Sequence, residues 1–69
     1  MTFGERIKMF REVRGISRAE FARQLGVTPS QISYIENGKT DLGASKIMAV
    51  CTVLKVTPNK LMGVKFLNE

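Results

Sequence analysis

Two short helix-forming segments with only a few residues between them place the tightest limit on how this chain folds. The first, residues 17–25, starts at a serine, a residue type that caps helix N-termini, and is ended by Gly26. The second, residues 28–36, starts at a threonine cap followed by proline, which the first helical position tolerates. Because the connection around Gly26 is so short, the two helices must cross steeply.

The residues within these two segments support the same arrangement. Ser17 with Glu20, and Thr28 with Gln31, match the capping box, in which two side chains bond each other's backbone N–H groups. Ala22 faces the second helix, where a larger side chain would push the helices apart. Apolar residues at helical spacing fill the core beneath both helices: Phe21, Leu25, Val27, Ile32 and Ile35.

Three more helical segments account for most of the remaining chain. Residues 3–14 place apolar side chains on one face, and residues 44–54 repeat them at helical spacing. A short helix begins at Thr57-Pro58, with Leu61 and Met62 as apolar anchors. Since no strand pattern competes, the sequence predicts an all-α fold, a compact four- to five-helix bundle forming one domain over residues 1–69. Residues 64–69 are expected to form a tail, a short strand or a dimer element.

The composition excludes several classes of function. With no histidine and one cysteine, the chain can form neither a Cys/His zinc site nor a Ser-His-Asp triad. The acidic residues form no pair with an obvious pocket, and no phosphate-binding glycine motif occurs, so we expect no enzyme, no metal and no cofactor. Eleven Lys and Arg residues against six Asp and Glu give a net charge of +5, which fits an anionic partner.

The sequence also bears on where the protein works. No apolar run approaches the roughly 20 residues that a membrane span needs, and the N-terminus is too charged for the apolar centre of a signal peptide. The lone Cys51 lies among apolar residues, which indicates a buried thiol in a reducing compartment. We therefore expect a cytoplasmic protein that does not associate with membranes.

The whole pattern resembles the Cro- and lambda-repressor-like helix-turn-helix regulators, also called the xenobiotic-response-element family. The resemblance covers about residues 3–62, and its most specific parts are Ile7, Arg11, residues 17–26 and residues 32–39. Residues 54–57, which lead into the last helix, also look like the family. It implies a bacterial or phage transcription regulator that binds a two-fold symmetric operator as a homodimer. Residues 28–36 would be the recognition helix, lying in the major groove of double-stranded DNA.

The resemblance also implies roles for individual residues. The candidates for reading bases lie on the recognition helix: Pro29, Ser30, Gln31, Ser33 and Tyr34. Relatives often carry glutamine at the first two of these positions. Pro29 cannot make the paired contact to adenine that glutamine makes, so the operators familiar from the family are not expected here. Gln31 either completes the capping box or reaches DNA.

A second group of residues would hold the DNA backbone. Asn37 and Lys39 match family positions that touch phosphates, and Arg18 stands where relatives often carry a glutamine that does so. The full set of phosphate candidates is Arg18, Thr28, Asn37, Lys39, Arg14 and Arg23. Arg11 and Glu36 match a family pair that joins the first helix to the end of the recognition helix, so we expect them to form a structural ion pair.

Each of these assignments has a purely structural alternative. Ser30, Ser33 and Arg18 can be ordinary solvated side chains, and Tyr34 can lie against the helix surface. The candidates for a dimer interface are Leu61, Met62, Val64, Phe66 and Leu67. Leu61 and Met62 can instead belong to the core. An alternative function is an antitoxin or similar interaction module, which neutralises a partner protein and represses its own promoter.

Overall fold

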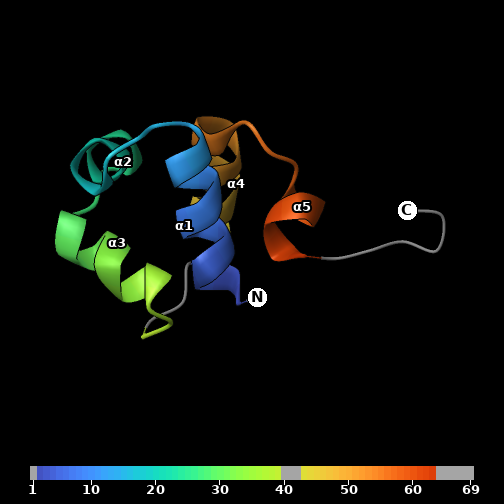
Figure 1. Ribbon diagram of the computed structural model, residues 1–69, viewed down its shortest axis with the longest axis horizontal. Coiled ribbons are helices and arrows are strands. Elements are labelled where there is room, and N and C mark those ends of the chain that lie inside the picture. Colours follow the sequence, from blue (N-terminus) through green and yellow to red (C-terminus); the bar gives the residue numbers. More distant parts are fainter. Residues whose placement is uncertain (1, 40–42, 64–69) are drawn as a thin grey trace, which may run out of the picture.

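The computed structural model of the protein describes residues 2–39 and 43–63, without the side chains of Ala44 and Ser45. Over these described residues the elements are five α-helices: α1 (Phe3–Val13), α2 (Arg18–Leu25), α3 (Pro29–Glu36), α4 (Ala44–Leu54) and α5 (Pro58–Met62). Figure 1 shows α1 in the middle, α2 and α3 on one side of it, α5 on the other, and α4 behind it. The predicted all-α bundle is confirmed, and the four longer helices begin and end within one residue of the expected positions.

Hydroxyl side chains cap four of the five helices. The hydroxyls of Thr2, Ser17, Thr28 and Thr57 each accept a hydrogen bond from the N–H three residues later. The fifth cap, Gly43, has no side chain to offer. Because a side-chain cap is worth about 1 kcal/mol, these residues fix where the helices start.

The reciprocal capping boxes do not all lie where the sequence placed them. The box of Thr28 and Gln31 is complete. The box expected at Ser17 is half formed, because the Glu20 carboxylate accepts hydrogen bonds from Arg23 and Gln24 on its own helix. A complete box that we did not predict joins Thr2 and Glu5 at the start of α1.

All five helices contribute to one core. Its buried members are Ile7, Phe21, Ala22, Leu25, Ile32, Ile35, Val50, Cys51, Leu54 and Leu61. Leu61 is completely covered by its own chain, so its assignment to a dimer interface was wrong. Fully burying a leucine side chain stabilises the fold by about 1.5–3 kcal/mol, which explains why the short α5 docks on this residue. Met62, next to it, stays 46% exposed and does not anchor the core.

Gly4 brings the start of α1 into direct contact with the end of α3. A Cβ atom at this position would lie 2.4 Å from the carbonyl oxygen of Ile35 and 2.6 Å from that of Glu36. Only glycine permits so close an approach of two backbones. The contact sets the position of α3 on α1.

No helix in residues 2–39 and 43–63 is long and apolar enough to cross a membrane.

Candidate nucleic-acid interface

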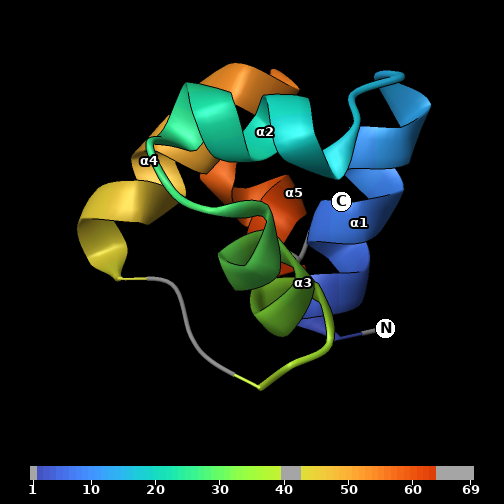
Figure 2. The same ribbon diagram turned by 90° about the vertical axis from the view of Figure 1, so that its left-hand side faces the viewer.

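The turn between α2 and α3 holds these helices in a fixed crossing. Gly26 adopts the left-handed conformation that ends α2, with φ of 72°. The N–H of Val27 returns to the carbonyl of Ala22 at 2.9 Å, and Thr28 then starts α3. Ala22 is completely buried where the two helices meet. Figure 2 shows α2 and α3 together on one face of the molecule, with α4 and α5 behind them.

The recognition-helix candidate α3 has two distinct faces. Ile32, Ile35 and Glu36 are buried against the bundle. On the opposite face Pro29, Ser30, Gln31 and Tyr34 are exposed, and Ser33 is half-buried. The one acidic residue of α3 is Glu36, so no carboxylate lies on the exposed face. This face can approach an anionic surface and present hydroxyl and amide groups to it.

Two of the polar side chains on α3 are partly engaged within the helix. The Gln31 side-chain oxygen accepts the Thr28 N–H at 2.8 Å, which leaves its amide N–H groups to donate elsewhere. The amide of Asn37 donates weakly to the Ser33 hydroxyl at 3.4 Å. Ser30 and Tyr34 are the other two hydroxyl residues among the base-reading candidates. Their hydroxyl groups make no hydrogen bond within the described residues. They are therefore available to a ligand.

The chain just after α3 directs Lys39 into solvent. Asn37 caps the helix, and Gly38 follows with φ of 73°. The Lys39 N–H then bonds the Tyr34 carbonyl at 2.8 Å, which fixes its backbone at the end of α3. Lys39 is exposed. Its backbone is thus held at the end of α3, and its side chain extends from there into solvent.

A buried ion pair ties α1 to the end of α3. Arg11 Nε donates to Glu36 Oε2 at 2.7 Å, and Arg11 Nη1 donates to the Ile16 carbonyl at 2.8 Å. The two side chains are 7% and 2% exposed. The structure thus brings together the pair that the sequence suggested. It also places Arg18 Nε on the same carboxylate, 3.2 Å from Oε1, a contact that the sequence pattern does not predict.

The two remaining arginine candidates are held elsewhere. Arg14 donates to the carbonyls of Leu54 and Lys55 at the C-terminus of α4, where a cation is favourable. Arg23 pairs with Glu20 on α2, and this hydrogen bond, assisted by Gln24, lowers the pKa of Glu20 to about 2. Neither guanidinium is directed to the exposed face of α3 by these contacts.

The local sequence pattern does not predict one contact near this interface. Lys46 on α4 donates to the carbonyl of Leu25 at 3.1 Å and so caps the end of α2. No local signal marks it, because the two residues are 21 positions apart.

Three of the candidates for a dimer interface, Val64, Phe66 and Leu67, lie outside the described residues.

The comparisons with known proteins place the chain in a family. A family model described as helix-turn-helix matches residues 7–61. YazB, an uncharacterised HTH-type transcriptional regulator of Bacillus subtilis, is 32% identical over 59 residues, which is 86% of each chain. The chain belongs to the Cro- and lambda-repressor-like helix-turn-helix family of transcription regulators.

Solved structures of DNA complexes share the fold. The P22 c2 repressor in complex with a synthetic operator has a TM-score of 0.86 at 26% identity, covering 94% of this chain and 98% of that one. SinR, the master regulator for biofilm formation, in complex with DNA, has a TM-score of 0.76 at 37% identity, covering 86% of this chain and 95% of that one.

Two uncharacterised HTH-type transcriptional regulators, from Sinorhizobium medicae and Rhizobium meliloti, are 34% identical over 53 residues. This chain spans 38% of the length of each.

Proposed function

We propose that this protein is a sequence-specific repressor that inserts α3 into the major groove of its operator and blocks transcription by occupying a promoter. The observation that carries the proposal is the exposed face of α3, which is polar, free of carboxylates and held on a rigid turn. The major groove admits one α-helix, and this face offers the groups that bond base edges.

Under this proposal the residues of α3 divide into two kinds. Ser30, Ser33 and Gln31 hydrogen-bond base edges, while Pro29 and Tyr34 supply apolar atoms for thymine methyl groups. Phosphates are bound by residues around the two ends of the helix: Arg18, Thr28, Asn37 and Lys39. Phosphate contacts fix the register of the protein on DNA, and base contacts select the sequence. Arg14 and Arg23 are left out of this set, because their guanidinium groups are engaged elsewhere in the bundle.

Selection of binding sites from random DNA with the purified protein tests the proposal. We expect enrichment of a two-fold repeat with half-sites about one helical turn apart.

Variants of the protein separate base contacts from phosphate contacts. Tyr34→Ala and Ser30→Ala should change the selected sequence. Lys39→Ala should weaken binding to all sequences. It should also reduce the slope of log K against log salt concentration by about 1, which corresponds to the loss of one phosphate contact. Lys60→Ala, an exposed lysine on α5, is the control and should change neither. Failure to enrich any sequence would contradict the proposal.

The proposed operator symmetry requires two copies of the protein. Met62 is 46% exposed on α5, and α5 lies on the other side of α1 from α3, so it stays accessible when α3 is on DNA (Figure 1). We propose that a homodimer forms through this surface together with Val64, Phe66 and Leu67.

A further inference from the structure

Glu36 accepts hydrogen bonds from two guanidinium groups at once. Arg11 reaches Oε2 through Nε at 2.7 Å and Oε1 through Nη2 at 3.3 Å. Arg18 reaches Oε1 through Nε at 3.2 Å. The three side chains come from α1, α2 and α3, so this cluster, Arg11–Glu36–Arg18, joins the three helices at one point.

The charges of this cluster do not cancel. Two guanidinium groups, which stay protonated in proteins, share one carboxylate, so one positive charge is left over. Arg11 and Glu36 are 7% and 2% exposed, whereas Arg18 is 48% exposed. Since charge is costly to bury, the excess lies on the outer part of Arg18. Within the described residues no other carboxylate pairs with Arg18.

Arg23, also on α2, shows the opposite arrangement. It pairs with Glu20 alone, and because one positive charge meets one negative charge, the pair carries no net charge. Both side chains of this pair are exposed to solvent. The two arginines are five positions apart on one helix and both are ion-paired. They differ in whether the partner carboxylate is already neutralised.

We infer that Glu36 is a positioning residue that holds Arg18 as a ligand for one phosphate group. Glu36 occupies Nε of Arg18, and Nη1 and Nη2 have no hydrogen-bond partner among the described residues. Those two nitrogens form the planar fork that matches two oxygens of a phosphate. Because the side chain is already held in place, binding costs less side-chain entropy than for a free arginine.

The position of this site suits the DNA backbone. Arg18 is the first residue of α2, and its partner Glu36 is the last residue of α3, next to Asn37. The inference rests on the proposed function for the identity of its ligand, a DNA phosphate. It adds the residue that orients the contact and the reason why arginine stands at this position.

Substitutions at Arg18, with Arg23→Gln as the matched control, test the inference on DNA. Arg18→Gln should lower affinity for all sequences and reduce the slope of log K against log salt concentration by about 0.9, which corresponds to one phosphate. Arg23→Gln should leave the slope unchanged. Arg18→Lys keeps the charge but cannot hold Glu36 and grip a phosphate through one fork, so it should recover only part of the affinity. A wild-type slope in Arg18→Gln, or full affinity in Arg18→Lys, would overturn the inference.

Inorganic phosphate gives a second measurement that does not need DNA. Replacing sodium chloride by sodium phosphate at equal ionic strength should raise the melting temperature of the wild-type protein more than that of Arg18→Gln, with Arg23→Gln behaving like wild type. Equal rises in all three proteins overturn the site. If the wild type bound no DNA but showed this difference, the proposed function would fail while the phosphate site would stand.

Discussion

At the scale of single residues, the buried Arg11–Glu36 pair makes the fold depend on one arginine. Arg11→Ala leaves the Glu36 carboxylate buried with only Arg18 as a charged partner. Losing one member of a buried pair costs about 3–5 kcal/mol, close to the whole stability of a domain of this size. Urea denaturation followed by circular dichroism should therefore show a largely unfolded protein.

Arg23→Ala is the control for this prediction. It breaks an ion pair whose two members are exposed, and such pairs contribute little to the stability of a fold because water screens them. If Arg11→Ala stayed as stable as the wild type but no longer bound DNA, Arg11 would be a DNA-contacting residue and its structural role would be refuted.

Gly4 offers a second residue-scale prediction. In Gly4→Ala the new methyl group meets the carbonyl oxygens of Ile35 and Glu36 at 2.4 and 2.6 Å, so α1 and α3 must move apart. Overpacking of this kind costs about 1–3 kcal/mol. Gly43→Ala is the matched control, because no atom of the described residues lies within 4 Å of its Cβ position and its φ is −67°. It should change the free energy of unfolding by less than about 1 kcal/mol. Equal effects in the two variants would contradict the close approach at Gly4.

At the scale of helices, α2 carries a pH-sensitive set of side chains. Glu20 accepts hydrogen bonds from Arg23 and Gln24, which lower its pKa from 4.5 to about 2. Because the folded state binds the ionised form better, this contribution is complete above pH 4.5 and is lost as the pH falls toward 2. The melting temperature of the wild type should therefore exceed that of Glu20→Gln at neutral pH, by a margin that shrinks over this range.

The control for the pH experiment lies on α1. Glu12 is exposed and has no ion pair among the described residues, so Glu12→Gln should track the wild type at each pH. A margin between wild type and Glu20→Gln that stayed constant from neutral pH down to pH 2 would show that Glu20 does not stabilise α2 through its charge.

The elements also show what the sequence could and could not reveal. Helix starts were predictable because a cap depends on residues three positions apart, as at Thr28 and Gln31. The half-formed box at Ser17 was not, because Glu20 had competing partners one turn later. Contacts between residues that are far apart in the sequence leave no local signal. Two of them are the hydrogen bond from Lys46 on α4 to the carbonyl of Leu25 and the ion pair between Arg18 and Glu36. The exposed face of α3 followed from helical spacing, whereas the availability of its individual groups needed the structure.

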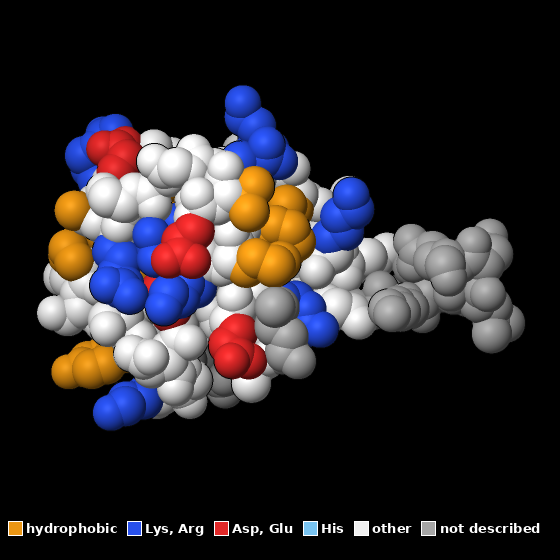
Figure 3. All heavy atoms as spheres, in the orientation of Figure 1, with side chains coloured by type: hydrophobic (Ala, Val, Ile, Leu, Met, Phe, Trp, Pro, Cys, Tyr) orange, Lys and Arg blue, Asp and Glu red, His pale blue; other side chains and the backbone are white. Residues whose placement is uncertain are grey.

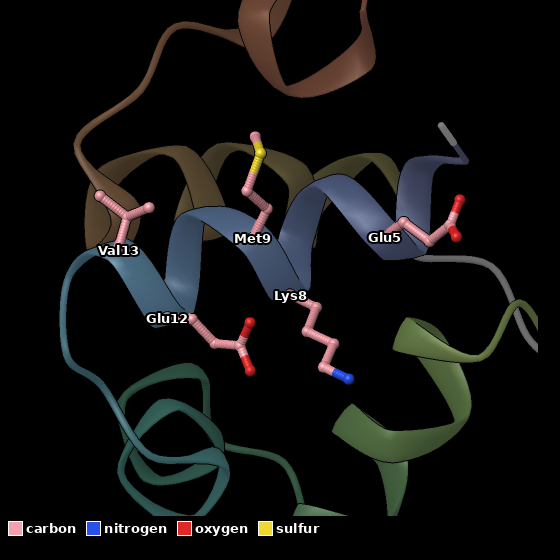
Figure 4. A pocket seen from close by; sticks show the side chains of 5 residues that line it. All are labelled: Glu5, Lys8, Met9, Glu12 and Val13. Carbon is pink, nitrogen blue, oxygen red and sulfur yellow. The ribbon is translucent and has the colours of Figure 1, made fainter.

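At the scale of the whole molecule, the polar face of α3 is separate from an apolar surface on α1 and α5. Met9, Val13 and Met62 are 36%, 73% and 46% exposed, and Figure 3 shows hydrophobic side chains gathered between α1 and α5. A shallow hollow on α1 is lined by Glu5, Lys8, Met9, Glu12 and Val13, with Met9 and Val13 on the side toward α5 (Figure 4). Because Met9 and Val13 lie on the side of α1 toward α5, the surface proposed for a second copy does not overlap the surface proposed for DNA.

The two-copy proposal makes a geometric prediction about the operator. Two half-sites one helical turn apart lie on the same face of DNA, and five added base pairs turn one of them to the opposite face. A dimer joined through α5 cannot then engage both, so affinity should fall to that of a single half-site in an electrophoretic mobility assay.

A variant of the protein should reproduce the effect of the DNA change. Met62→Ser removes an exposed apolar side chain from α5 and should lower affinity for the intact operator while leaving single half-site binding unchanged. Met48→Ser, which alters a 60% exposed methionine on α4, is the control and should bind like the wild type. If the wild type bound the original and the lengthened operators equally well, the two copies would act independently. The two-fold arrangement would then come from the DNA alone, and α5 would have no part in assembly.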